Sequence, residues 1–278
     1  MRTQNGNQSP SPPWTKELQI RLTNMSRIRG PLHYRRSIAS TQEEALALAS
    51  EGTPEGTIVI ASEQTKGRGR HGRKWFSEAG GLWMSVVLRP RVPAQETTLI
   101  TLMAALGVVK ALLDLPVPNP CISWPNDIRV GKAKVAGVLS EAVFSGHQLS
   151  HVVLGLGLNA NNPLDSLRPT LEQPIASIQE ILGHPVSLGE VAHASLQQFD
   201  NLYVEANRNG FTHLLPSVKT YMVTLGRRVV IVLEEGECSG IATDLSPNGD
   251  LLVKDRNGRL LTVRAEFVKQ VSLGNQEV

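Results

Sequence analysis

The clearest periodicity in the chain is helical and runs over residues 97–115, where apolar side chains recur every three or four positions. This spacing predicts a helix that lies against a sheet. A second helix is predicted at 41–50, because Ser40 and Glu43 before and within it have capping-box spacing. A third is predicted at 187–208, where another capping box precedes a long helical stretch.

Short apolar and β-branched runs between these helices predict strands. The runs at 56–64 and 81–90 lie on either side of a Gly/Arg-rich stretch. Three more, at 121–130, 133–144 and 149–161, are separated by turn residues, which predicts an antiparallel meander. The order of helices and strands predicts an α+β domain whose mainly antiparallel sheet is covered by helices.

The pattern of apolar and turn residues changes after about Val223. Short strands then alternate with Pro-Asn-Gly-Asp and Arg-Asn-Gly-Arg turns, and no helical period remains. This predicts a small all-β barrel of about fifty residues. We therefore expect a leader at 1–32, a large domain at 33–222 and a small one at 223–273, a division that suits a chain of 278 residues.

The net charge of +3 is unevenly distributed along the chain. Residues 1–42 hold seven Lys or Arg and one acid, which leaves −3 for the rest. The basic excess lies in a leader rich in Ser, Pro and Asn, which we expect to be disordered. It is a tail or, being Arg-rich and acid-poor, an organelle-targeting segment, and we prefer the tail. Because the folded body is mildly acidic, no nucleic-acid partner is expected.

The composition is that of an ordinary globular protein. No apolar run approaches the roughly 20 residues that span a bilayer, and no signal-peptide pattern opens the chain, so no membrane partner is expected. Cys121 and Cys238 lie far apart without metal-ligand spacing. This favours a reducing compartment, and we expect a cytoplasmic protein.

The stretch "TKGRGRHGRKWFSEAGG" at 65–81 joins two predicted strands and concentrates positive charge on glycines. Its glycines match G-x-G-x-x-G, but a strand follows where a dinucleotide site needs a helix, so we reject that interpretation. Arginine forks and close backbone approach instead suit an anion, and we expect a loop that a polyanion orders. A solvated basic loop or an RNA-binding segment is an equal alternative from the loop alone. The cations are Lys66, Arg68, Arg70, Arg73 and Lys74.

Two further motifs add polar groups. "WPND" at 124–127 is followed by Lys134 across a hairpin that turns at Gly131-Lys132, so Asn126, Asp127 and Lys134 can converge. Lys134 suits a phosphate, although most single lysines only face solvent. In "GLGLNAN", strand alternation places two glycines and Asn159 on one face. They leave room for a ligand across the sheet, or they mark a bulge or tight packing.

Together these motifs resemble the biotin protein ligase family. The resemblance rests on "STQEEA", "GRGRHGRKW", "WPND" with Lys134 and "GVLSE", and "GLGLNAN", and it covers about 34–273. It implies a class II synthetase/lipoate-ligase-like catalytic domain and an SH3-like β-barrel. It also implies a two-step reaction, in which ATP and biotin give biotinyl-5′-AMP and the biotinyl group then passes to a carrier lysine.

The resemblance also implies roles for individual residues. Those expected at biotin are Ser40, Thr41, Gln42, Gln64, Arg68, Gly69, Arg70 and Lys134. Those expected at the nucleotide are Arg70, Arg73, Trp75, Asn126, Asp127, Lys134 and Asn159. The residues expected in the chemistry are Lys134, Arg70 and Arg68, and Asp127 is expected to bind Mg²⁺. Trp75 and Trp124 could instead be core residues.

The expected partner is the biotin carboxyl carrier protein of acetyl-CoA carboxylase or a related carrier domain. Two positions depart from the family pattern: Ser123 stands where Lys is common, and Gln42 where Asn is common. The alternatives are a lipoate or octanoate ligase of the same fold, or a biotin-responsive DNA-binding regulator. Because about 32 residues precede the catalytic domain and a winged helix needs roughly 60, we expect none here. A homodimer through a sheet edge is compatible with this interpretation.

Overall fold

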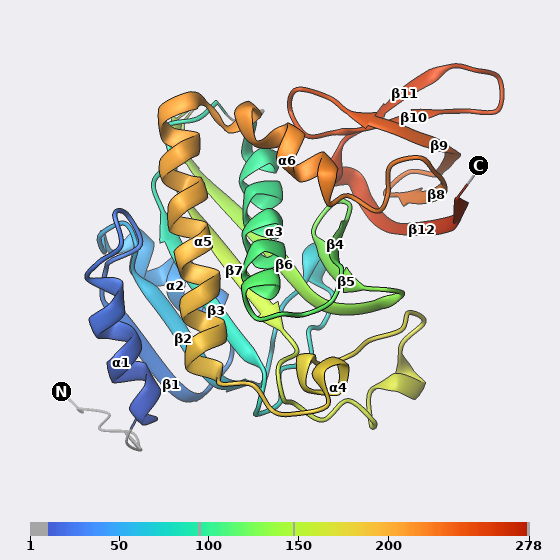
Figure 1. Cartoon of the computed structure of the whole chain (residues 1–278). Coiled ribbons are helices and arrows are strands. Elements are labelled where there is room, and N and C mark those ends of the chain that lie inside the picture. The colour runs from blue at the N-terminus through green and yellow to red at the C-terminus, as the bar shows by residue number, and fades with distance from the viewer. Residues whose placement is uncertain (1–10, 94–95, 147, 277–278) are drawn as a thin grey trace.

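A seven-stranded sheet forms the centre of the large domain. The computed structural model describes residues 11–93, 96–146 and 148–276. The strand order is β1-β2-β3-β7-β6-β5-β4 (Figure 1). Neighbours are antiparallel except β1 and β2, which are parallel, so the prediction of a mainly antiparallel sheet is confirmed. The strands are β1 (Leu32–Ile38), β2 (Ile58–Gln64), β3 (Leu82–Leu88), β4 (Pro120–Ser123), β5 (Asp127–Val130), β6 (Ala133–Ser145) and β7 (Gln148–Leu158).

Helices cover both faces of this sheet. The long helices α3 (Thr97–Asp114) and α5 (Leu188–Asn209) lie side by side on one face (Figure 1). Helix α2 (Thr41–Ser50) packs against β2, β3 and β7 with a small apolar cluster of its own. These three agree with the helices predicted from sequence. Three short helices were not predicted: α1 (Pro13–Leu22), α4 (Ile178–Leu182) and α6 (Leu215–Thr220).

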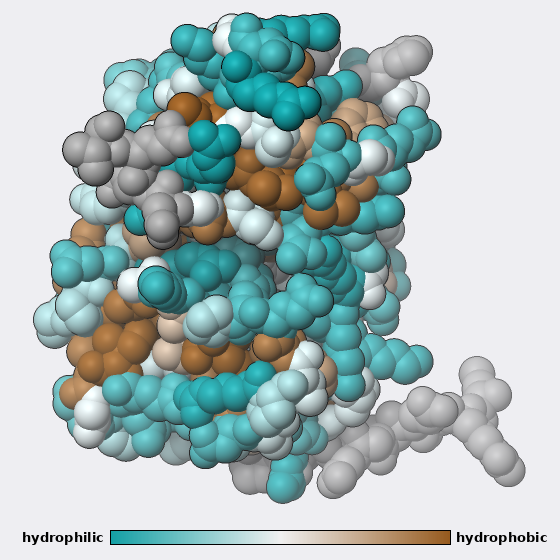
Figure 2. All heavy atoms as spheres, turned by 90° about the vertical axis from the view of Figure 1, so that its right-hand side faces the viewer, coloured by the Kyte–Doolittle hydropathy of each residue, from teal (hydrophilic) through white to brown (hydrophobic). Residues whose placement is uncertain are grey.

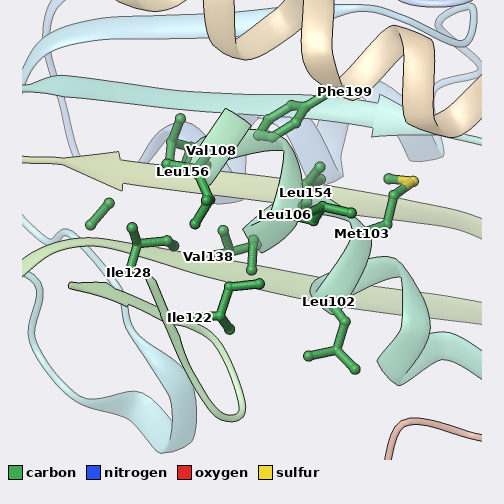
Figure 3. Close-up of a cluster of buried hydrophobic side chains, with 14 of the residues drawn as sticks. Leu102, Met103, Leu106, Val108, Ile122, Ile128, Val138, Leu154, Leu156 and Phe199 are labelled. Atoms are coloured by element: carbon green, nitrogen blue, oxygen red, sulfur yellow. The ribbon is translucent and has the colours of Figure 1, made fainter. Parts of the chain in front are cut away.

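The main core fills the space between the sheet and the pair α3/α5. Figure 3 shows side chains of α3 meeting those of β4 to β7, with Phe199 of α5 above them. Gly107 is required at this crossing, because a Cβ there would lie 2.5 Å from the Phe199 ring. Helix α3 is long and apolar enough to cross a membrane by length and composition, but 67% of it is buried. It is the central helix of this core.

Two details of the predicted elements are wrong. The run 121–130 is two strands, because the chain turns back between β4 and β5 at Trp124–Asn126. The Ser40 side chain makes no capping bond, although Ser40 is the residue before α2. The first-turn amide of Thr41 instead donates to Gln64 Oε1 at 2.8 Å. Gln64 therefore satisfies one of the unpaired amides at the start of α2.

The prediction of a disordered leader is wrong for residues 11–32, while residues 1–10 lie outside the described part. Helix α1 packs against α5, and four apolar side chains of this segment have at most 2% exposure. The carboxylate of Asp200 in α5 accepts backbone N–H bonds from Ser26, Arg27 and Ile28, each at 2.7 Å. The polar composition of the segment led to the wrong prediction, because its few apolar residues are widely spaced among polar ones. The buried residues are Leu18, Leu22, Met25 and Ile28.

The C-terminal part is a separate five-stranded antiparallel sheet in the order β11-β10-β9-β8-β12. An all-β unit is therefore present, and closure into a barrel stays a prediction. Trp124 joins it to the large domain, since its indole N–H donates to the Gly249 carbonyl at 3.0 Å. The side of the molecule that carries this sheet shows hydrophilic bands with hydrophobic patches between them (Figure 2). The strands are β8 (Arg227–Leu233), β9 (Glu237–Leu245), β10 (Leu251–Lys254), β11 (Leu260–Val263) and β12 (Val268–Gln276).

Replacing Asp200 should destabilise the whole protein. In Asp200→Ala three backbone amides lose their acceptor, and each unpaired buried amide costs about 1–3 kcal/mol. We expect a loss of about 3 kcal/mol or more in the free energy of unfolding, measured by urea denaturation. Asn201→Ala, at the next and exposed position of α5, should change it by less than about 0.5 kcal/mol. Similar losses in both variants would mean that Asp200 does not anchor the leader.

Candidate active site

A cavity of about 1210 Å³ opens between the large sheet, the Gly/Arg loop and the C-terminal sheet. Its size exceeds that of many single-ligand sites, so two small substrates can share it. Of the residues that the structure describes, nine Lys or Arg line it, against the two acids Asp127 and Glu172. The cavity therefore suits anions. Every residue predicted for the site lines it: Ser40, Thr41, Gln42, Gln64, Arg68, Gly69, Arg70, Arg73, Trp75, Asn126, Asp127, Lys134 and Asn159.

Hydroxyl and amide groups at the start of α2 form one polar wall. Gln64 Oε1 accepts from the Thr41 hydroxyl at 3.1 Å as well as from its amide, and Gln64 Nε2 donates to Ser77 Oγ at 2.8 Å. These partners fix the Gln64 side chain. The Ser40 hydroxyl, by contrast, is buried without a hydrogen-bond partner. It is therefore the group of this wall that is free to bond a ligand.

Gln42 and the glycines of β7 form a packed floor. Gln42 Nε2 donates to the Val153 carbonyl at 3.0 Å, and its Oε1 accepts from Ser85 Oγ at 3.1 Å. A Cβ on Gly155 would lie 2.5 Å from Gln42 Oε1, and one on Gly157 would lie 2.5 Å from the Trp75 indole. Gln42 and Trp75 therefore occupy the space next to these glycines. Both glycines still line the cavity, and the room for a ligand across this part of the sheet stays a prediction.

The Gly/Arg loop folds back on itself. The Gly69 amide donates to the Arg73 carbonyl at 2.7 Å, and the Trp75 amide donates to the Gly67 carbonyl at 2.9 Å. Gly67 must be glycine, because a Cβ would lie 2.3 Å from the Trp75 carbonyl oxygen. The glycines therefore let the cations of the loop come close to one another.

Carboxylates flank Arg68. Its guanidinium lies 3.3 Å from Glu141 on β6 and 3.7 Å from Glu43 on α2. Neither acid was predicted from sequence as a partner of the loop, although "GVLSE" contains Glu141. Arg68 is thus held over the sheet between two elements, while its side chain stays 39% exposed.

Arg70 reaches from the loop to the C-terminal sheet. Its guanidinium donates to the carbonyls of Ala265 and Val268, the latter at 3.2 Å, and to Asn126 Oδ1 at 3.4 Å. Burial lowers the pKa of Arg70 from its ordinary value, and the nearby Asp127 carboxylate opposes this shift. Arg70 therefore connects the loop, the "WPND" turn and the C-terminal sheet.

The hairpin of β5 and β6 brings together the residues that were predicted to bind the nucleotide phosphates. Lys134 Nζ lies 2.6 Å from Asp127 Oδ1 and 5.0 Å from the centre of the Trp75 ring. Asn126 Nδ2 donates to the Val138 carbonyl at 2.8 Å, which fixes the turn. Asn159 is buried beside them and accepts from Asn162 Nδ2 at 3.2 Å. The convergence that the "WPND" motif predicted is present in the structure.

Asp127 is the acid that could help to hold a metal here. Mg²⁺ is usually bound through one or two carboxylates together with substrate phosphates. Within 11–93, 96–146 and 148–276 no three His, Cys, Asp or Glu side chains gather as a metal cage. Asp127 therefore fits a Mg²⁺ ion that arrives with a phosphate substrate.

Among the described residues, four further cations line the cavity and were not predicted from sequence: Arg129, Lys132, Arg227 and Lys269. Arg129 lies on β5 two residues after Asp127, and strand alternation could have placed it on the same face. Arg227 opens β8 in the C-terminal sheet and also lines the cavity. No local pattern pointed to Arg227, because the two sheets meet only in the folded chain.

Sequence comparison relates this chain to known proteins. The profile of the "Biotin/lipoate A/B protein ligase family" matches residues 34–159. "Bifunctional ligase/repressor BirA" of Bacillus spizizenii is 33% identical over 87% of this chain and 75% of the relative. "Biotin--[acetyl-CoA-carboxylase] ligase" of Paracoccus denitrificans is 31% identical over 82% of this chain and 95% of the relative.

Comparison with solved structures agrees with the sequence comparison. "Biotin protein ligase from Aquifex aeolicus in complex with biotin and ATP" has a TM-score of 0.74 and 27% identity. The match covers 88% of this chain and 99% of the other.

Gly157→Ala should be destabilising through Trp75. The added Cβ would overlap the indole, and overpacking of this kind costs about 1–3 kcal/mol. We expect the free energy of unfolding, measured by urea denaturation, to fall by that amount in an otherwise unchanged chain. In a Trp75→Ala background the same substitution should cost much less, because the clashing ring is gone. An equal cost in both backgrounds would show that Trp75 does not require this glycine.

Proposed function

This chain belongs to the biotin protein ligase family and is an enzyme, and from that premise we propose that it activates biotin with ATP and transfers it to a carrier lysine. The observation that carries the proposal is the meeting of Arg68, Arg70 and Lys134 in one cavity with a polar wall at α2. Two anionic substrates need such positive charge, because their approach is repulsive. An unpartnered Ser40 hydroxyl beside this charge suits a neutral, polar ring.

We place the biotin ring against the wall formed by Ser40, Thr41 and Gln64. Ser40 supplies the free hydroxyl, while Thr41 and Gln64 shape the wall. Gln42 supports this wall without contacting biotin, since its side-chain amide is hydrogen-bonded to Ser85 and to the Val153 carbonyl. The biotin carboxylate then points toward Lys134 and Arg68 and lies beside Gly69.

The nucleotide lies on the other side of Lys134 in this proposal. Asn126, Asn159 and Trp75 surround the adenylate, and Arg73 and Arg70 face its phosphates. Mg²⁺ near Asp127 would neutralise phosphate charge when bound. The protein's own part is to position the two anions and to stabilise the charge that develops between them.

The chemistry then has two steps. A biotin carboxylate oxygen attacks the α-phosphorus of ATP, a new O–P bond forms, and the bond to pyrophosphate breaks. Lys134 stabilises the charge on the α-phosphate during this displacement. In the second step the amine of a carrier lysine attacks the biotinyl carbonyl, loses a proton to form the amide, and AMP leaves.

The partner proposed from these relatives is a biotin carboxyl carrier domain, such as that of acetyl-CoA carboxylase. The C-terminal unit, proposed to be an SH3-like barrel, supports the loop through Arg70. A homodimer formed through a sheet edge and a cytoplasmic location also belong to the proposal. Lipoate or octanoate is the less favoured substrate, because the relatives named above are biotin ligases.

A substrate comparison tests the proposed function. Purified protein is mixed with labelled ATP, Mg²⁺ and either biotin, lipoate or octanoate. We expect biotin to support acyl-adenylate formation and pyrophosphate exchange far better than the other two acids. Preference for lipoate or octanoate would overturn the assignment of substrate.

Lys134→Ala should mainly slow adenylation. The lysine meets the reacting phosphate, so its loss should lower biotin-dependent pyrophosphate exchange by roughly 10²-fold or more, while biotin affinity changes less. Lys132→Ala removes an exposed lysine from the same hairpin and should have a much smaller effect. Near-normal exchange by the Lys134 variant would contradict the assigned role.

Arg70→Gly should release the adenylate early. The substitution removes the contacts to Ala265, Val268 and Asn126 and adds backbone freedom, so the loop should open more often. We expect preformed biotinyl-AMP to dissociate about tenfold faster or more, with biotin appearing on an unrelated lysine-rich protein. Lys66→Gly, which removes an exposed cation of the same loop that does not line the cavity, is the matched control. Equal release by the Arg70 variant and the wild type would exclude a retaining role.

A further inference from the structure

Arg129 is a cation of the cavity that the proposed reaction has not used. It lies on β5 directly opposite Lys134 on β6, and both side chains line the cavity. Directly opposite residues of an antiparallel pair have Cα atoms about 4.5–5.5 Å apart. Two like charges in such a position destabilise the pair unless an anion lies near them.

The carboxylate near this pair is that of Asp127, and it forms its ion pair with Lys134. Asp127 lies 2.6 Å from Lys134 Nζ. Arg129 instead donates to two neutral oxygens, the Lys132 carbonyl at 2.7 Å and Gln173 Oε1 at 2.6 Å. Its Nε is buried without a partner, and within the described part of the chain it has no carboxylate within ion-pair distance. Arg129 is therefore held in place without a carboxylate partner of its own among the described residues.

A second arginine lies at the same corner of the cavity. Burial raises the pKa of the Cys121 thiol, and the positive charges of Arg129 and Arg227 oppose this shift, so both guanidiniums act on one thiol. Cys121 pairs with Arg129 across β4 and β5. The large sheet and the C-terminal sheet thus each contribute a guanidinium to this corner, next to Lys134.

We propose that Arg129, with Arg227 beside it, forms the subsite for the two terminal phosphates of ATP, which leave as pyrophosphate. The proposal rests on the proposed function, in which Lys134 meets the α-phosphate. Arg129 lies one step across the hairpin from Lys134, so the rest of the polyphosphate chain can extend toward it. Guanidinium forks match phosphate oxygens in geometry and charge. Bound phosphate would also relieve the repulsion between Arg129 and Lys134.

Binding of inorganic pyrophosphate tests the subsite directly. Titration calorimetry on the full chain compares the wild type with Arg129→Gln, Arg129→Lys and Arg256→Gln, the last removing an exposed arginine outside the cavity. We expect Arg129→Gln to weaken pyrophosphate binding about tenfold or more, because a charge-assisted contact is lost. Arg129→Lys should weaken it less, and Arg256→Gln should not change it. Thermal unfolding verifies that each variant is folded.

Steady-state kinetics gives the second measurement. Arg129→Gln should raise the KM for ATP about tenfold and change the KM for biotin much less. If the wild type activates biotin but Arg129→Gln binds pyrophosphate normally, the subsite is wrong and the proposed function stands. If biotin is not activated but pyrophosphate binding still depends on Arg129, the proposed function fails and the subsite stands. Failure of the wild type to bind pyrophosphate would also overturn the subsite.

Discussion

Repulsion among gathered cations is the constraint on which the rest of this site depends. Several cations occupy a cavity that burial partly removes from water, where like charges repel more strongly than in bulk solvent. The fold answers with local partners: Arg68 has Glu43 and Glu141, Lys134 has Asp127, and Arg70 has backbone carbonyls. Each partner holds a cation in position without filling the cavity with acids.

The partners come from elements outside the loop. Glu141 and Asp127 lie on neighbouring strands of the large sheet, and the carbonyls that bind Arg70 belong to the C-terminal part. The glycine-rich loop supplies cations but little rigidity, because its backbone conformations are permissive. The large sheet and the C-terminal part therefore fix where the cations of the loop are held.

The elements with strong local patterns were predictable from sequence, and the contacts between distant segments were not. The periodicity of α3 and the alternation in β7 predicted a helix and a strand, and the "WPND" motif predicted the convergence with Lys134. The leader was misread because its anchor, Asp200, lies far away in α5. Arg227 was missed for the same reason. The contact of Gly157 with Trp75 was also missed, because it depends on where the loop folds back.

In a charged cavity, the carboxylates that hold the cations compete with an anionic substrate for the same cations. A phosphate that binds Lys134 must share it with Asp127, and a carboxylate that binds Arg68 must compete with Glu141. Cations whose partners are neutral oxygens carry no such competition, because a carbonyl group compensates little of the charge. Arg129 is of this kind. The same distinction separates cations that mainly hold the empty site together from those whose charge is available to an anion at once.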